Sequence, residues 1–196
     1  MGLAQRELCP EGWFALTVRH QHEWQVEQWL SAQGWPTFVP SYRVERQWSD
    51  RRKQIQLPLF SGYVFCQFPL TQKSAVLRTP GVVNIVSFAG APAMLDPREF
   101  GQLQQALASG FPFAPWSHLR SGDRVRIERG PLKGVEGHLL EDAGVARLVI
   151  GIEMLHRLVA VDLPPNFVSY PLPARLPGQA QFQAHAQVQG GRLANF

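Results

Sequence analysis

Apolar and polar positions alternate along the first half of the chain in patterns that predict strands and helices in turn. Residues 13–19 are rich in aromatic and β-branched side chains, which favours a β-strand. Residues 22–33 carry Val26, Trp29 and Leu30 at spacings of three and four, which predicts a helix with one buried face. Glycine follows this segment and is suited to end the helix.

The segment of residues 58–68 is apolar at nearly every position. Because successive side chains of a strand point to opposite sides, Tyr63 and Phe65 would share one side, and Val64 and Cys66 the other. A small antiparallel sheet usually buries one side and exposes the other to water. We therefore expect the second, aromatic side to be covered, either by a layer of helices or by another protein.

Two further helices are predicted in this half. Thr71 is placed to cap a short helix, and residues 82–88 alternate as a strand after it. Asp96 and Pro97 favour the start of a helix that reaches about Ala108. The resulting order of strands and helices predicts an α+β fold, in which helices pack on an antiparallel sheet.

The pattern changes near residue 110. Residues 110–119 show no periodicity, which indicates a linker. Beyond it, about five short β-type runs separated by glycine suit a small closed barrel. Gly130 and Gly134 suit the tight loop between its first two strands. The expected core of the barrel comprises Val125, Ile127, Val135, Leu139, Leu148 and Ile150.

These boundaries divide the chain into a first domain at residues 12–109, the linker at 110–119, a barrel at 120–170 and a tail at 171–196. The tail is rich in Pro, Gln, Ala and Gly and predicts disorder.

Composition narrows the classes of function. The 196 residues carry a formal net charge of +4, which permits contact with nucleic-acid phosphates without demanding it. No apolar run approaches the roughly 20 residues of a membrane helix, and the first residues lack the order of a secretory signal. The two cysteines, Cys9 and Cys66, lie far apart, so a reduced, cytoplasmic protein without membrane contact is expected.

The sequence offers little support for an enzyme. The six histidines are scattered and lack partners at metal-ligand spacing. No glycine-rich phosphate loop precedes a helix, and neither cysteine has a catalytic context. We expect no catalysis, no cofactor and no metal, and a nuclease is kept as the enzyme alternative.

Several motifs carry a resemblance to a known family. Residues 48–53 (WSDRRK), 58–65 (PLFSGYVF) and 79–83 (TPGVV) resemble the amino-terminal domain of NusG-type transcription elongation factors. The closer likeness is to the specialised UpxY-like antiterminators of capsule and polysaccharide operons. Residues 122–137 resemble the KOW motif that opens the SH3-like barrel of the same family. Ser61 departs from the pattern, because the family commonly has proline there.

The resemblance implies a protein that binds RNA polymerase across the DNA cleft and suppresses pausing or termination. Phe60, Tyr63 and Phe65 would then be anchors on the clamp helices of the largest polymerase subunit. The alternative is that these rings pack under the domain's own helices. A second polymerase contact is implied at Thr71, Gln72 and Lys73, for which a plain helix cap is the alternative.

The resemblance also implies contact with the non-template DNA strand in the transcription bubble, through cationic side chains and their neighbours. An ordinary solvated surface is the alternative for these residues. The candidates are Arg19, His20, Arg51, Arg52, Lys53, Arg78 and Thr79.

In the barrel, family precedent gives a ribosomal small-subunit protein or the Rho helicase as partners. The candidate contacts are Ile152, Met154 and Leu155, which can equally be cap residues of the barrel. The competing function is that of a ribosome-associated or RNA-binding KOW protein that does not bind polymerase.

Overall fold

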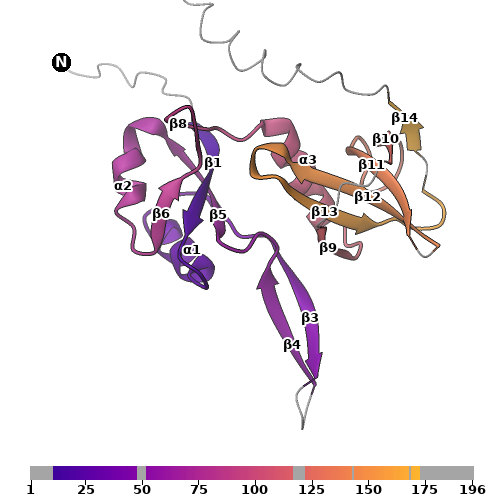
Figure 1. The fold of residues 1–196 in the computed structure, drawn as a ribbon, viewed down its shortest axis with the longest axis horizontal. Coiled ribbons are helices and arrows are strands. Elements are labelled where there is room, and N and C mark those ends of the chain that lie inside the picture. Colours follow the sequence, from indigo (N-terminus) through magenta and orange to yellow (C-terminus); the bar gives the residue numbers. More distant parts are fainter. Residues whose placement is uncertain (1–10, 48–51, 117–121, 143, 168, 173–196) are drawn as a thin grey trace, which may run out of the picture.

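A computed structural model describes residues 11–47, 52–116, 122–142, 144–167 and 169–172. It contains a four-stranded sheet in the order β2-β5-β1-β6 and a six-stranded sheet in the order β14-β10-β11-β12-β13-β9. Figure 1 shows them on either side of one helix, α3. All strand pairs within these sheets are antiparallel, so the expected α+β class is confirmed.

The first sheet is formed by β1 (Glu11–Val18), β2 (Thr37–Phe38), β5 (Tyr63–Pro69) and β6 (Val82–Ile85). One of its sides packs on α1 (Glu23–Ala32) and α2 (Lys73–Leu77), which follows a short 3-10 turn, η1 (Leu70–Gln72). The predicted alternation in β5 is confirmed, because this side and the opposite side belong to different clusters. The helix side buries Phe14, Leu16, Val26, Leu30, Val64, Cys66, Phe68 and Val76.

The opposite side of the sheet packs on α3 (Pro97–Ala108). The helix begins as predicted, since the Asp96 carboxylate accepts the backbone N–H of Arg98 at 2.7 Å. Proline occupies the first helical position, where no intrahelical donor is needed. Phe100, Leu103 and Ala106 recur every three residues and form the buried stripe of the helix.

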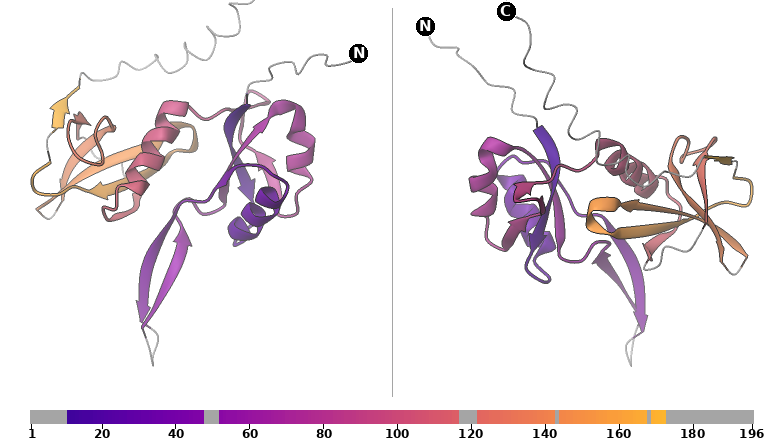
Figure 2. Two further views of the ribbon diagram at one scale, coloured as in Figure 1. Left: turned by 180° about the vertical axis from the view of Figure 1, so that it is seen from behind. Right: turned by 45° about the horizontal axis from the view of Figure 1, so that its top comes forward.

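Two hairpins project from this domain. The larger pairs β3 (Ser41–Gln47) with β4 (Arg52–Pro58) as a separate two-stranded sheet. In Figures 1 and 2 this hairpin extends away from both larger sheets. The smaller pairs β7 (Ser87–Phe88) with β8 (Ala91–Pro92), so the strand expected over residues 82–88 is divided between β6 and β7.

The second sheet, which we call the barrel, contains six strands and one 3-10 turn. Its predicted core residues are buried, except that Leu139 is half-buried. Gly130 and Gly134 lie in the loop between residues 127 and 136, which joins the second and third barrel strands, with φ of 79° and 86°, a region that favours glycine. The elements are β9 (Phe113–Trp116), β10 (Asp123–Ile127), β11 (Glu136–Asp142), β12 (Val145–Ile152), η2 (Glu153–Leu155), β13 (Arg157–Asp162) and β14 (Ser169–Pro171).

Two expectations about chain organisation are wrong in part. The segment expected as a linker, residues 110–119, contains β9, which pairs with β13 from Phe113 to Trp116. The expected tail begins within β14, and its residues 173–196 lie outside the described residues. Thr71 is also not a helix cap, because α2 begins after Gln72 with no side-chain cap.

Candidate protein and nucleic-acid interfaces

Five aromatic rings meet between the first sheet and α3. The ring of Phe100 lies 4.7 Å from Trp13, 5.9 Å from Phe38 and 5.2 Å from Phe65, measured between centroids. Phe60 meets Phe65 edge-on at 5.7 Å. These separations are in the range at which aromatic pairs are favourable, so the cluster holds α3 on the sheet.

This packing corrects one expectation about the polymerase-binding candidates. Phe65 is 0% exposed and Phe60 is 2% exposed, so neither presents an uncovered ring. Tyr63 is half-buried and keeps part of its surface accessible. Of the two alternatives for the aromatic side of β5, covering by the chain's own elements is the one observed.

A second side of α3 contacts the barrel. Gln105 donates from Nε2 to the backbone oxygens of Pro131 at 3.0 Å and Lys133 at 2.9 Å, in the loop between β10 and β11. At the other end of the helix, the Glu99 carboxylate accepts the backbone N–H of Glu153 at 3.2 Å. The helix therefore bridges the two domains through polar contacts at both of its ends.

The apolar contact between the domains is continuous. One cluster of buried residues joins the α3 stripe and the aromatic side of the first sheet to the core of the barrel. The barrel candidates Ile152 and Leu155 belong to this cluster and are buried, and Met154 packs against it half-buried. The expectation that these three side chains are open to a partner is therefore wrong for Ile152 and Leu155.

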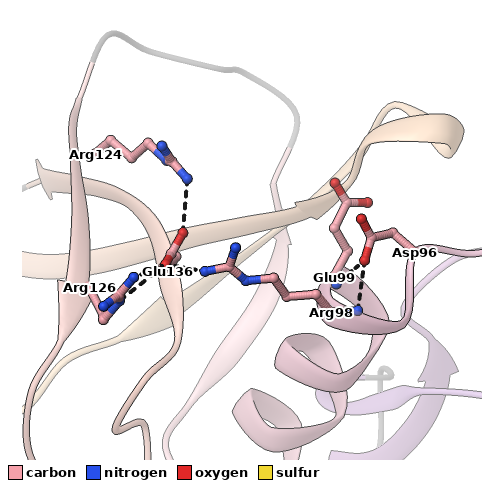
Figure 3. Close-up of polar contacts among 6 residues, drawn as sticks. All are labelled: Asp96, Arg98, Glu99, Arg124, Arg126 and Glu136. Carbon is pink, nitrogen blue, oxygen red and sulfur yellow. Dashed lines mark hydrogen bonds and ion pairs between the residues drawn. The ribbon is translucent and has the colours of Figure 1, made fainter. Parts of the chain in front are cut away.

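An ionic cluster lies at the same junction (Figure 3). The buried carboxylate of Glu136 accepts from Arg124 Nη2 at 2.8 Å and from Arg126 Nη2 at 2.7 Å. Arg98 of α3 pairs with the same carboxylate from the other domain. Three guanidinium groups from two domains thus share one carboxylate.

The pKa of Glu136 follows from this arrangement. Burial by itself raises the pKa, but the hydrogen bond from Arg126 and the charges of Arg98, Arg126 and Arg124 lower it by more. The net pKa is lowered, so the carboxylate is ionised at neutral pH and the ion pairs are present.

The cationic candidates for DNA contact lie in two places. Arg19 and His20 are exposed after β1, and the Arg19 backbone N–H donates to Gly81 O at 2.9 Å. This bond brings the end of β1 beside the loop that follows the exposed Arg78. Arg52 and Lys53 are exposed on the β3–β4 hairpin, apart from that loop in Figure 1.

Two other candidates for DNA contact are not exposed residues of the described structure. Thr79 is 3% exposed, so its inclusion among the DNA contacts is wrong for this structure. Its hydroxyl accepts from Gln33 Nε2 at 3.4 Å. Arg51 lies outside the described residues.

Thr71, Gln72 and Lys73 are all exposed where η1 meets α2. Their exposure is compatible with a protein contact and does not demand one.

Sequence reasoning missed two features of these surfaces. Phe88, at the β7–β8 hairpin, is 75% exposed, and the sequence signal was an aromatic residue directly before an Ala-Gly turn. The pairing of Arg98 with Glu136 joins residues from separate domains, and neither residue lies in a local motif that would indicate it.

Among the residues that the structure describes, no group of three or more His, Cys, Asp or Glu side chains is placed to hold a metal ion. No helix in the described ranges is both long enough and apolar enough to cross a membrane.

Comparison with known proteins finds a family match in the first domain. Residues 11–104 match the family model for NusG, described as transcription termination factor NusG. The match covers the first sheet and the first two turns of α3.

Solved structures show general likenesses. A structure of the domain interaction in Thermotoga maritima NusG is 21% identical, covers 78% of this chain and 93% of that chain, and has a TM-score of 0.49. The MjSpt4:Spt5 complex in conformation A is 15% identical, covers 81% of this chain and 92% of that chain, with a TM-score of 0.28. Conformation B of that complex is 16% identical, covers 82% of this chain and 99% of that chain, and has a TM-score of 0.27. The likeness to the NusG family therefore rests on the sequence match over residues 11–104.

Proposed function

Because residues 11–104 form a domain of the NusG family, we propose that the chain is a transcription elongation and antitermination factor that binds RNA polymerase. The role is non-catalytic and needs no cofactor. It acts by binding the pause-resistant state of polymerase better than the paused state, which shifts the equilibrium between them. The family match is the single observation that carries this proposal.

The aromatic side of the first sheet is the proposed polymerase contact, on the clamp helices of the largest subunit. Tyr63 is the accessible member of the three candidates, while Phe60 and Phe65 are covered. Docking through all three rings requires that α3 and the barrel move away from this side. Thr71, Gln72 and Lys73 remain the proposed contacts to the other large polymerase subunit.

Phe88 supports an apolar contact surface on this domain. It is the most exposed of the large apolar side chains in the described ranges. Val86, two residues earlier, packs against the apolar cluster that contains Phe60 and Phe65. A ring left in water beside such a cluster is typical of a docking surface.

The remaining parts of the proposal follow the two domains. The non-template strand is contacted through its phosphates, which are the usual acceptors for cationic side chains on DNA. The contacting residues are Arg19, His20 and Arg78. The barrel recruits a ribosomal small-subunit protein or Rho once its contact with α3 opens. In its narrower form, the proposal is that the chain acts in the cytoplasm as a specialised, UpxY-like antiterminator.

The test is binding of the full chain to purified RNA polymerase, followed by a pause-lifetime assay in vitro. Tyr63→Ala should weaken binding about ten-fold, because an interface aromatic contributes about 1–2 kcal/mol or more. Phe65→Ala is unsuited, since removing a fully buried ring would destabilise the fold by about 3–5 kcal/mol and confound the binding measurement. Val145→Ala, at an exposed apolar position of the barrel, is the matched control.

The competing function is an RNA-binding barrel protein without polymerase contact. It predicts no binding of the wild type to polymerase and equal RNA binding by the Tyr63→Ala variant. If polymerase binds wild type and Tyr63→Ala equally, the proposed docking side is wrong.

A further inference from the structure

The β3–β4 hairpin is a two-stranded ribbon that projects from the body of the protein (Figures 1 and 2). Its strands carry four cationic side chains and a single carboxylate, Glu45. These strands therefore carry a local surplus of three positive charges. The cations are Arg43, Arg46, Arg52 and Lys53.

The register of the ribbon separates two different faces. On one face, Tyr42 is paired with Leu57 and Val44 with Ile55, all half-buried, and Tyr42 packs against the apolar cluster of the body. The opposite face consists of polar side chains that are exposed along nearly its whole length. We call this second face the amide face. Its pairs are Arg43 with Gln56, Glu45 with Gln54, and Gln47 with Arg52.

The cations of the ribbon have no acidic partner within the described residues. The ion pairs of the described ranges involve other arginines, and Glu45 is engaged by the Gln54 amide at 3.4 Å. Arg46 and Lys53 lie directly opposite one another at the end of the apolar face. Like charges in directly opposed positions destabilise a strand pair, and a bound anion would remove that cost.

We propose that the β3–β4 ribbon binds duplex DNA in the major groove, with the amide face toward the base edges. A two-stranded ribbon fits the major groove, which is about 12 Å wide. Strands of seven residues extend about 23 Å, which is long enough for the ribbon to lie along the groove with one face toward several base pairs. Glutamine and arginine are the side chains that recognise adenine and guanine edges there, and Arg46 and Lys53 contact phosphates.

The chemistry of the face favours DNA over other polyanions. The major groove of double-stranded RNA is too deep and narrow for a ribbon to enter. Single strands are bound mainly by aromatic stacking, and the amide face carries no aromatic residue in the described strands.

This inference goes beyond the proposed function, since it concerns duplex DNA and requires no polymerase. Its experiment therefore uses the full chain alone with labelled nucleic acids, and polymerase binding is measured separately. A chain that binds duplex but not polymerase contradicts the proposed function alone, and the reverse result contradicts the ribbon proposal alone.

The first measurement is fluorescence anisotropy with a duplex DNA of about two helical turns, ~20 bp, across salt concentrations from about 50 to 200 mM. Duplex RNA and single-stranded DNA of the same length are the competing probes. We expect duplex DNA to bind most tightly. Methylation of guanine N7, which lies in the major groove, should weaken binding, whereas a minor-groove ligand should not compete.

Variants divide the two roles of the ribbon. Arg46→Gln with Lys53→Gln should lower the slope of log affinity against log salt by about two, because each phosphate contact contributes about 0.9. The control is Arg129→Gln with Lys133→Gln, which removes two exposed cations from the barrel. Gln54→Ala should leave the salt slope unchanged and reduce the preference for a selected duplex by about 5- to 150-fold.

The decisive outcomes are separate. Equal losses in the ribbon and barrel variants would show only a diffuse charge effect and overturn the proposal. Tighter binding of duplex RNA or single-stranded DNA, or indifference to N7 methylation, would also overturn it. Selection from a random duplex pool that enriches no sequence would overturn base-edge recognition by the amide face.

Discussion

Arg98, in the first turn of α3, and Glu136, at the start of β11, form an ion pair that joins the first domain to the barrel. The pair lies between two surfaces that the proposed function assigns to different partners. On one side of α3 lie the covered rings of the proposed polymerase-binding face, and on the other lie the buried barrel residues Ile152 and Leu155. The same helix therefore covers both candidate partner surfaces at once.

Reversing the charge of Arg98 should loosen this contact. Arg98→Glu replaces an ion pair with a repulsion, while an acidic residue in the first turn remains favourable for the helix itself. Because the Arg98 side chain is 59% exposed, we expect a loss of about 1 kcal/mol, roughly five-fold in the ratio of open to closed chains. NMR relaxation should show the two domains tumbling more independently than in the wild type.

Arg157→Glu, on an exposed barrel position, is the charge-matched control and should leave tumbling unchanged. Under the proposed function, Arg98→Glu should also bind polymerase more tightly than wild type. Domains that still tumble as one body in the variant would mean that the ion pair does not hold the contact.

The Phe100 ring supports the fold from within. Phe100→Ala should reduce the free energy of unfolding by about 3–5 kcal/mol, because the ring contacts three other aromatic rings and is buried. Phe88→Ala removes an identical ring that is 75% exposed, and we expect a change within about 0.5 kcal/mol. Urea unfolding followed by circular dichroism measures both. A Phe100→Ala loss as small as that of Phe88→Ala would show that α3 is not packed as described.

The sequence predicted the features that depend on neighbouring residues. The start of α3 was predictable from Asp96 and Pro97, because a cap and a helix-compatible φ act within one turn. The two-sided character of β5 was predictable because side chains alternate along any strand. The family likeness of the first domain was predictable from its motifs.

The features that required contacts between distant segments were not predictable. From the sequence, either a layer of helices or another protein could cover the aromatic side of β5. The choice depends on how Phe100 meets Phe65 across the fold. Ile152 gave no signal that α3 would cover it, since the two lie in separate domains. Thr71 failed as a cap because the chain first forms a 3-10 turn after Pro69.

The Glu136 cluster should make the free energy of unfolding depend on pH in the acidic range. Its pKa is lowered in the folded state, so its stabilising effect is present above the unfolded value, about 4.3, and is lost as pH falls through the folded pKa. Glu136→Gln should therefore cost about 1–3 kcal/mol at neutral pH. The difference in Tm between wild type and variant should shrink below about pH 4.

The comparison between the two proteins at each pH is the control, because other carboxylates titrate equally in both. A Tm difference that stays constant from neutral pH to about pH 3 would show that the charge of Glu136 is not the stabilising feature.

Cys66 should be unreactive while the protein is folded. Its side chain is 0% exposed in the core between the first sheet and its helices, and burial raises the pKa of the thiol to about 12. At pH 8 only about one thiol in ten thousand is then ionised, and the thiolate is the reactive form. In a Cys9→Ser background, a thiol-specific reagent should label Cys66 only as fast as the domain opens. In guanidinium at an unfolding concentration, labelling should be prompt and stoichiometric. Prompt labelling of the native protein would show that Cys66 does not lie in a closed core.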